Sequence, residues 1–273
     1  MKTAKNETGI NTQNTVLNQE PKPRETSTYS SGDDLAKNAR PPEYLVDAVL
    51  PVGSNGILRG ETMAFKTFTA LNLAHSVSTG RPFFGHTVFK PGKVIYVCGD
   101  GMGGIPRRLK ALEISEGKFN DDVYLYLDSR FRIDDPEIMA ELRQSIEELQ
   151  PVLIIFDALT SLAFTMDENS RLDVASTIQL IKDTCSFGDT STLIVHHYDD
   201  YSGKGLGSTP LMSCVDFAWE MNRVPDSMSA TLRCLKNNEG EAFTDIDLLA
   251  QIVDIPPIED GESYTSLVIN PKH

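Results

Sequence analysis

The sequence predicts an α/β fold in which a mostly parallel central sheet is flanked by helices and extended by antiparallel strands towards the C-terminus. Three observations support this prediction. Strand-like and helix-like runs alternate from residue 57 to residue 197, which is typical of parallel strands joined by helical crossovers. The run PVLIIFD at 151–157 is apolar and β-branched until its last residue, as in a strand buried on both faces. The run GETMAFKT at 60–67 joins the first such strand to the first helix.

The first half of the predicted domain follows from periodicity and from residues that start and stop helices. A helix over 68–77 has apolar residues at helical spacing, and Gly80-Arg81-Pro82 ends it. A buried strand over 93–100 ends in a carboxylate and precedes a helix over 105–115. A strand over 123–127 is followed by a helix over 136–149, which Asp134-Asp135 and Pro136 open.

The second half begins with the central strand at 151–157 and a helix over 172–187, followed by a buried strand over 191–197. Four later runs have strand composition and short turns between them, at 217–223, 230–235, 243–253 and 266–269. We interpret these runs as an antiparallel extension of the same sheet. The segment 167–169 is expected to cap the helix that follows it.

The composition indicates whether the chain is a globular, a membrane or a secreted protein. The 273 residues suffice for one large or two small domains, and 40% hydrophobic with 23% charged residues is typical of a soluble globular chain. No apolar run approaches the roughly 18 residues that a membrane span requires, and the first residues lack the apolar centre of a signal peptide. We therefore expect a cytoplasmic protein without a membrane partner.

Residues 1–40 are rich in Asn, Thr, Ser, Glu and Lys and hold few large apolar side chains. This composition predicts a disordered N-terminal tail, and the folded domain is expected to span 41–273. Four cysteines are scattered without a metal-binding spacing, which favours reduced thiols: Cys98, Cys185, Cys214 and Cys234.

Net charge is −14 and the pI is about 4.8. This balance argues against a protein that coats nucleic acid through a broad basic face. Any nucleic-acid contact has to be local, as in the lining of a ring or channel.

The run at 60–67, called the phosphate loop below, has the pattern of a Walker A motif. A loop that opens with Gly and closes with Lys-Thr at a helix start holds phosphate through backbone N–H groups and the helix dipole. In this pattern Lys66 reaches the β- and γ-phosphates and the Thr67 hydroxyl binds Mg²⁺. The predicted ATP-binding residues are Gly60, Glu61, Thr62, Met63, Ala64, Phe65, Lys66 and Thr67.

The phosphate loop departs from the pattern at one position, because Phe65 stands where the second Gly belongs. If that position requires a positive φ, a Phe there costs roughly 1–2 kcal/mol. The alternative interpretation of the run is a fortuitous turn.

Polar residues lie at the ends of the predicted strands, where ligands bind in an open α/β sheet. Asp157 follows four apolar residues and matches a Walker B carboxylate that holds Mg²⁺ together with Thr67. A single Asp at a strand end can instead cap a turn, but four polar strand ends in one chain favour a site.

Asp100 is a candidate general base that orients the attacking water, and its alternative role is that of a turn residue. His196 and His197 are candidate sensors of the γ-phosphate, although one of the two rings can instead face the core. Metal binding by both is disfavoured because adjacent residues of a strand point to opposite faces.

The Gly-rich segment 202–208 either contacts DNA through Lys204 or is a plain surface loop. Arg107-Arg108 are expected to be solvated.

The order of these motifs resembles the RepA-like hexameric helicases and ATPases of plasmids and phages, within the RecA/DnaB class of P-loop proteins. The resemblance spans about 44–253 and includes YLVDAVLPVGSNGILRG, STGRPFFG, VIYVCGDG, VLIIFDALTSL, DENS, and LIVHH before a Gly-rich loop and GSTPL. It implies a RecA-like ATPase that uses ATP and Mg²⁺, forms a ring, expected to be a hexamer, and acts on single-stranded DNA in replication.

The resemblance also assigns roles. It makes Asp100 the catalytic carboxylate and His196 or His197 the γ-phosphate sensor, beside Lys66. It implies a cationic finger from a neighbouring subunit, for which Arg233 and Lys236 are the candidates.

Three residues depart from the family pattern: Phe65 replaces Gly, Asp100 replaces Glu, and Leu206 stands where relatives carry Arg. Because one finger is worth about 10³–10⁵ in rate, these changes are expected to lower turnover. They support an alternative function, a nucleotide-binding switch or an assembly or recombination factor with weak or no hydrolysis. A small-molecule kinase is disfavoured because no Arg-rich lid lies between Asp157 and His196.

Overall fold

The computed structural model describes residues 30–118, 121–197, 209–257 and 262–272. The chain divides into two units, Met1–Pro41 and Pro42–His273. The described part of the first unit holds the short helix α1 (Gly32–Lys37), whose N-cap Ser31 accepts a hydrogen bond from the Asp34 N–H. Most of the predicted tail and the predicted Gly-rich loop with Lys204 and Leu206 lie outside the described residues.

The second unit is built on a large sheet, and its fold class is the predicted α/β class. Among the described residues this sheet has the strand order β11-β10-β9-β8-β3-β7-β6-β4-β5, and β1 pairs with β2 in a separate small sheet. The strands from β8 to β5 in this order pair in parallel, whereas β9, β10 and β11 pair antiparallel. The prediction that the run 217–223 belongs to the antiparallel extension is therefore wrong on one side, because β8 pairs in parallel with β3 and antiparallel only with β9. The strand bounds are β1 (Tyr44–Val46), β2 (Leu50–Pro51), β3 (Asn55–Gly60), β4 (Val94–Cys98), β5 (Val123–Tyr126), β6 (Leu153–Asp157), β7 (Ser191–His197), β8 (Phe217–Arg223), β9 (Ser229–Asn237), β10 (Ile246–Ile255) and β11 (Tyr264–Pro271).

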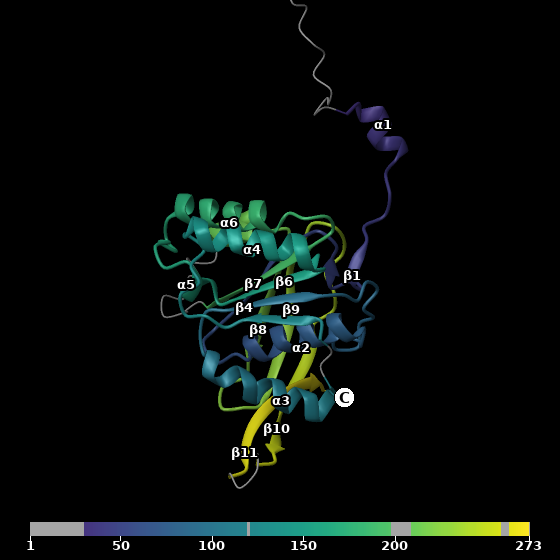
Figure 1. Cartoon of the computed structure of the whole chain (residues 1–273). Coiled ribbons are helices and arrows are strands. Elements are labelled where there is room, and N and C mark those ends of the chain that lie inside the picture. Colours follow the sequence, from purple (N-terminus) through teal and green to yellow (C-terminus); the bar gives the residue numbers. More distant parts are fainter. Residues whose placement is uncertain (1–29, 119–120, 198–208, 258–261, 273) are drawn as a thin grey trace, which may run out of the picture. The chain divides into compact units, whose positions relative to one another are not determined.

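Helices cover both faces of the sheet (Figure 1). α2 (Lys66–Thr79) and α3 (Ile105–Glu116) lie on one face, and α4 (Pro136–Leu149) and α6 (Arg171–Cys185) lie on the other. Two separate clusters of buried apolar side chains fill the two layers. The remaining helical elements are η1 (Met102–Gly104), α5 (Leu159–Leu162) and α7 (Thr209–Cys214). No helix in the described ranges is long and apolar enough to cross a bilayer.

The helix ends follow the residues that predict them. Asp135 caps α4 by accepting hydrogen bonds from the N–H groups of Glu137 and Ile138, and Pro136 occupies the first turn. Gly80 follows α2 with a φ of 73°, a left-handed conformation that glycine adopts at little cost. The helix that begins at Arg171 is capped by Ser170 and not by the predicted segment 167–169, because the Ser170 side chain accepts from the Asp173 N–H.

Several predicted strands differ in their bounds from the structure by a few residues, and two of these differences come from identifiable contacts. The strand predicted over 93–100 ends at Cys98, and the Gly99 N–H then donates to the Asp157 carbonyl of the neighbouring strand. The strand predicted over 243–253 begins at Ile246, because the buried Phe243 ring packs against Trp219 instead. Each of these two differences comes from a tertiary contact that the local pattern does not contain.

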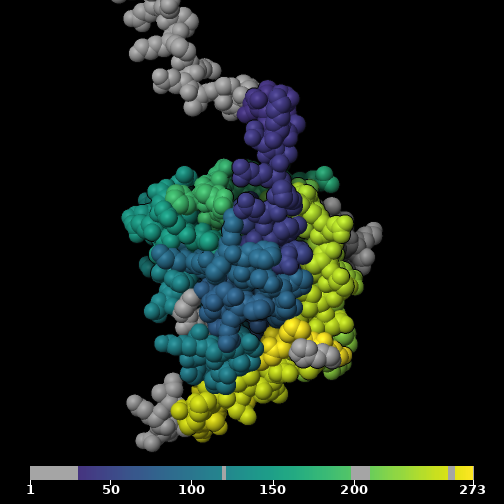
Figure 2. Space-filling view, turned by 90° about the vertical axis from the view of Figure 1, so that its right-hand side faces the viewer, coloured from purple at the N-terminus to yellow at the C-terminus, as the bar shows by residue number. Residues whose placement is uncertain are grey.

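The C-terminal strands fold back over the first helical layer. On the face shown in Figure 2 the yellow C-terminal residues lie against the blue and teal residues that include α2 and α3. β11 contacts both α2 and α3. The antiparallel extension therefore contributes side chains near the start of α2.

Candidate functional site

The phosphate loop begins where β3 ends at Gly60. A Cβ atom at Gly60 would lie 2.5 Å from the backbone oxygen of Met221 in the adjacent strand β8, so only glycine fits there. At the other end of the loop, α2 begins at Lys66. Its N-cap residue Phe65 has no polar side-chain atom, so the first turn of α2 has no side-chain cap, and a helix N-terminus of this kind favours an anion.

Phe65 adopts the left-handed conformation, with φ 67° and ψ 16°. The position of the missing glycine therefore does require a positive φ, and the cost of roughly 1–2 kcal/mol applies to this side chain. Met63, also in the loop, has a φ of 67°. The phosphate loop thus holds two non-glycine residues at positive φ, a conformation that is unfavourable for side chains with a Cβ atom.

Packing offsets this strain. The Phe65 ring is buried and meets the Phe68 ring edge-on at 6.2 Å between centroids. The Arg223 guanidinium lies over the Phe65 ring, 4.5 Å from its centroid. The same guanidinium donates to the carbonyls of Met63 at 3.2 Å and Ser227 at 2.9 Å. Arg223 therefore fixes the loop to the end of β8.

Lys66 is buried, with 3% of its surface exposed. Its ammonium donates hydrogen bonds to the carbonyls of Gly60 at 2.7 Å and Glu61 at 2.6 Å. These contacts hold the ammonium inside the loop, and Lys66 also lines the cavity described below.

Asp157 ends β6 and is 3% exposed. Its carboxylate accepts a hydrogen bond from the Tyr96 hydroxyl at 2.5 Å and another from the Thr67 hydroxyl. Burial raises the pKa of Asp157, while the hydrogen bonds from Tyr96 and Thr67 and the nearby His197 and Arg108 oppose that rise. A buried carboxylate beside a threonine hydroxyl is an oxygen donor set of the kind that Mg²⁺ prefers.

Asp100 and Arg108 reach the site from β4 and α3. β4 is separated from β3 by β7 and β6 in the sheet, but parallel strands end at one edge, so Asp100 comes to the same space. Arg108 was expected to be solvated, and the structure instead places its guanidinium 5.1 Å from the Phe68 ring centroid. Gly101 and Gly104 lie next to this guanidinium.

The two histidines at the end of β7 lie in different surroundings. His197 pairs with Gly60 across the ladder to β3, and His196 pairs with Arg59. His196 is fully buried, and neither ring nitrogen has a hydrogen-bond partner among the described residues. Burial, and then the nearby His197, Lys66 and Arg59, lower the pKa of His196 to about 4. His196 is thus a neutral core residue near neutral pH.

A cavity of about 430 Å³ joins these elements. It contains predicted residues from the phosphate loop, β6 and β7 together with residues that the sequence did not single out. Gly60, Glu61, Thr62 and His196 are not among its lining residues. The lining residues are Met63, Ala64, Phe65, Lys66, Thr67, Phe68, Asp100, Gly101, Arg108, Asp157, His197, Arg223, Met228 and Leu267.

Three residues near the site were not identified from the sequence, and the local sequence signal for each of them differs in strength. Arg223 closes the run 217–223, and it would have been a usable signal had that strand been predicted as parallel, because the parallel pairing of β8 with β3 brings its carboxyl end to the ligand-binding edge. Tyr96 lies inside an apolar strand run, and its hydroxyl needs a partner when buried. Leu267 gives no local signal, because its position depends on how β11 packs on α2 and α3.

The two candidate fingers are both engaged within the chain. Arg233 forms an ion pair with Asp245 at 2.9 Å, and its side chain is 48% exposed. The Lys236 ammonium donates to the carbonyl of Met212 in α7 and to that of Val215 just after α7, and it lies partly buried. Of the two, Arg233 has the more accessible side chain for contact with another subunit, and its role there stays a prediction.

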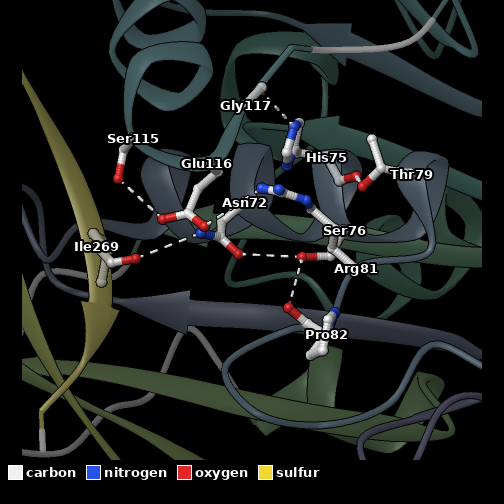
Figure 3. Close-up of polar contacts among 10 residues, drawn as sticks. All are labelled: Asn72, His75, Ser76, Thr79, Arg81, Pro82, Ser115, Glu116, Gly117 and Ile269. Carbon is white, nitrogen blue, oxygen red and sulfur yellow. Dashed lines mark hydrogen bonds and ion pairs between the residues drawn. The ribbon is translucent and has the colours of Figure 1, made fainter.

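A second polar cluster, shown in Figure 3, fastens the C-terminal half of α2 to its surroundings. Asn72 donates to the Ile269 carbonyl of β11 at 3.4 Å, and Ser76 donates to the Pro82 carbonyl at 3.3 Å. His75 contacts the Gly117 carbonyl at 3.2 Å, and burial lowers the pKa of His75. This cluster determines where β11 lies relative to the start of α2.

The fold and the cavity together define a P-loop protein of the RecA-like ATPase class. Residues 20–200 match a protein-family model described as an AAA domain, so the chain belongs to that family. The crystal structure of the RadB recombinase superposes with a TM-score of 0.54 at 13% identity, covering 80% of this chain and 91% of that one. That likeness concerns the fold. No curated protein matches the sequence.

Proposed function

We propose that the protein binds Mg²⁺-ATP in the cavity at the phosphate loop and hydrolyses it. The observation that carries this proposal is the convergence of five residues on one cavity from four different elements or loops: Lys66 and Thr67 of α2, Asp157 of β6, His197 of β7, and Asp100 after β4. Family membership supports an ATPase in general terms. Each residue type matches a distinct requirement of phosphoryl transfer.

The chain's own groups would divide the chemistry as follows. Thr67 and Asp157 hold Mg²⁺, which when bound neutralises charge on the β- and γ-phosphate oxygens. Lys66 leaves its carbonyl partners to bind the same phosphates. Asp100 accepts a proton from the attacking water as that oxygen bonds to the γ-phosphorus, and the bond to the bridging oxygen breaks with its electron pair passing to ADP. His197 donates a hydrogen bond to the γ-phosphate.

More specifically, we propose that the protein assembles into a hexameric ring and acts as a motor on single-stranded DNA during replication. The motif order of the RepA-like helicases supports this proposal. A ring needs few DNA contacts per subunit, which is compatible with a net charge of −14. The fold likeness to a recombinase is an equal reason to consider DNA recombination as the setting.

A second candidate function is a nucleotide-dependent switch or assembly factor that hydrolyses ATP weakly or not at all. The short Asp100 side chain favours it, because it places the proposed general base farther from the attacking water without changing the phosphate loop. The left-handed Phe65 favours it because strain in that loop is expected to lower turnover.

Steady-state ATP hydrolysis with and without single-stranded DNA separates the two functions. Lys66→Ala removes the phosphate-binding ammonium, and Lys110→Ala removes an exposed lysine of α3 as the matched control. DNA-stimulated turnover that only Lys66→Ala abolishes supports the motor. ATP binding without turnover in either condition supports the switch, and an absence of ATP binding contradicts both.

A further inference from the structure

The lining of the cavity at the phosphate loop combines two chemically different groups of side chains, called its polar half and its apolar half below. Lys66, Thr67 and Asp157 line one half with charged and hydrogen-bonding groups. The other half is formed by Phe68, Met228 and Leu267, with the Arg223 guanidinium at its border. Phosphates account for the polar half of the cavity and leave its apolar half unexplained.

The apolar half is held rigidly from the C-terminal strands. The Met228 carbonyl accepts a hydrogen bond from the Ala250 N–H of β10 at 2.8 Å. Leu267 pairs with Ile252 in the β10–β11 ladder, and β11 is tied to α2 two residues further on, where Asn72 donates to the Ile269 carbonyl (Figure 3). These contacts fix the two aliphatic side chains opposite the first turn of α2.

Arg223 presents a planar group at the same place. Its Nε and Nη1 atoms already donate to the carbonyls of Ser227 and Met63, and Phe65 lies against one face of the guanidinium. A guanidinium held flat in this way offers a surface on which a planar aromatic ligand stacks.

We propose that this apolar half holds the nucleobase and that Arg223, Met228 and Leu267 recognise it by stacking and apolar contact. The inference rests on the proposed nucleotide function and specifies the substrate class of the same site. Adenine and guanine differ in the hydrogen-bonding groups on their edges, which aliphatic side chains do not read. The protein therefore accepts ATP and GTP with affinities that agree within about threefold, and binds CTP less well because a pyrimidine offers less stacking area.

The test is equilibrium binding of ATP, GTP, CTP and inorganic tripolyphosphate to the full chain in the presence of Mg²⁺. Tripolyphosphate carries the phosphates without a base, so it reports on the polar half alone. The variants Met228→Ser and Leu267→Ser are expected to weaken ATP about tenfold and to leave tripolyphosphate binding within about twofold of the wild type. Leu172→Ser, at an apolar residue of α6 that is 82% exposed and lies on the other face of the sheet, is the matched control.

Arg223→Lys provides an independent readout, because it keeps the positive charge but removes the planar guanidinium group. Because Lys also lacks the hydrogen bond to the Met63 carbonyl of the phosphate loop, some tripolyphosphate affinity should be lost, but ATP affinity should fall several-fold more. Equal losses of ATP and tripolyphosphate in these variants would overturn the proposal, as would a hundredfold preference for ATP over GTP. If the wild type binds neither ATP nor tripolyphosphate, the proposed function itself fails. Thermal melting of each variant distinguishes lost binding from lost folding.

Discussion

Phe65 shows how one residue can be strained and still be retained. Its φ of 67° is unfavourable for a side chain with a Cβ, yet its ring is buried against Phe68 and Arg223. Burying an aromatic ring contributes about 1.5–3 kcal/mol, which is more than the left-handed conformation costs.

The backbone cost at this position can be measured by comparing Phe65→Gly with Phe65→Ala. Both variants lose the ring, but only Ala keeps the strain, so the Gly variant should be more stable by about 1 kcal/mol. Urea unfolding measures the difference. At an ordinary helical position Ala is the more stable residue, so a more stable Ala variant here would contradict a strained phosphate loop.

His196 gives a prediction about pH. Its folded pKa of about 4 lies below the value of 6.5 for an unperturbed imidazole, so the unfolded chain binds more protons between these two values. Stability is therefore lost as the pH falls from about 6.5 to about 4, by on the order of 3 kcal/mol from this residue. The raised pKa of Asp157 contributes a slope of the opposite sign.

Replacing the buried imidazole isolates its share of the pH dependence. His196→Leu should be at least as stable as the wild type at pH 7, because two buried nitrogens without partners are removed. It should also lose less stability on acidification, as measured by urea unfolding at several pH values. His86→Leu, at a partly exposed histidine, is the control. Equal acid sensitivity of the wild type and His196→Leu would rule out this role for His196.

Tyr96 is expected to act on the site through Asp157. Tyr96→Phe removes the hydroxyl that donates to the buried carboxylate, so the pKa of Asp157 should rise further and stability should fall by about 1–3 kcal/mol. Under the proposed function, the affinity for Mg²⁺-ADP should decline more steeply with falling pH in this variant than in the wild type. Titrations at pH 6 and pH 8 measure that decline. An unchanged pH dependence would show that the hydroxyl does not influence the carboxylate.

At the scale of elements, the close approach of β3 and β8 sets the position of the phosphate loop. A methyl group at Gly60 would meet a backbone oxygen of Met221, which cannot move without shifting β8. Gly60→Ala should therefore destabilise the protein by about 1–3 kcal/mol and weaken nucleotide binding. Gly103→Ala is the control, since a Cβ there meets nothing within 4 Å. Equal melting temperatures for the two variants would contradict this packing argument.

The elements also show what the sequence can and cannot predict. β6 and α4 were predicted well because a continuous β-branched run and an Asp-Pro helix start are local signals. The AAA-domain match and the fold confirm the RecA-like part of the resemblance, while the helicase part stays a proposal. Arg108 and Leu267 could not be assigned, because their positions depend on the packing of α3 and β11 across the first helical layer.

At the scale of the whole molecule, the sheet brings residues from distant parts of the chain to one edge. Lys66 and Leu267 belong to opposite ends of the second unit and line one cavity. The antiparallel extension is therefore part of the candidate site as well as of the fold. Loss of β11 should abolish nucleotide-base recognition and expose the apolar start of α2.

The central claim is that this cavity hydrolyses ATP with Asp100 as the general base. The most direct measurement is the steady-state turnover of Asp100→Asn beside the wild type, with ATP binding measured on the same samples. We predict that the variant binds ATP with wild-type affinity and loses turnover by at least about a hundredfold. Wild-type turnover in Asp100→Asn would contradict the account.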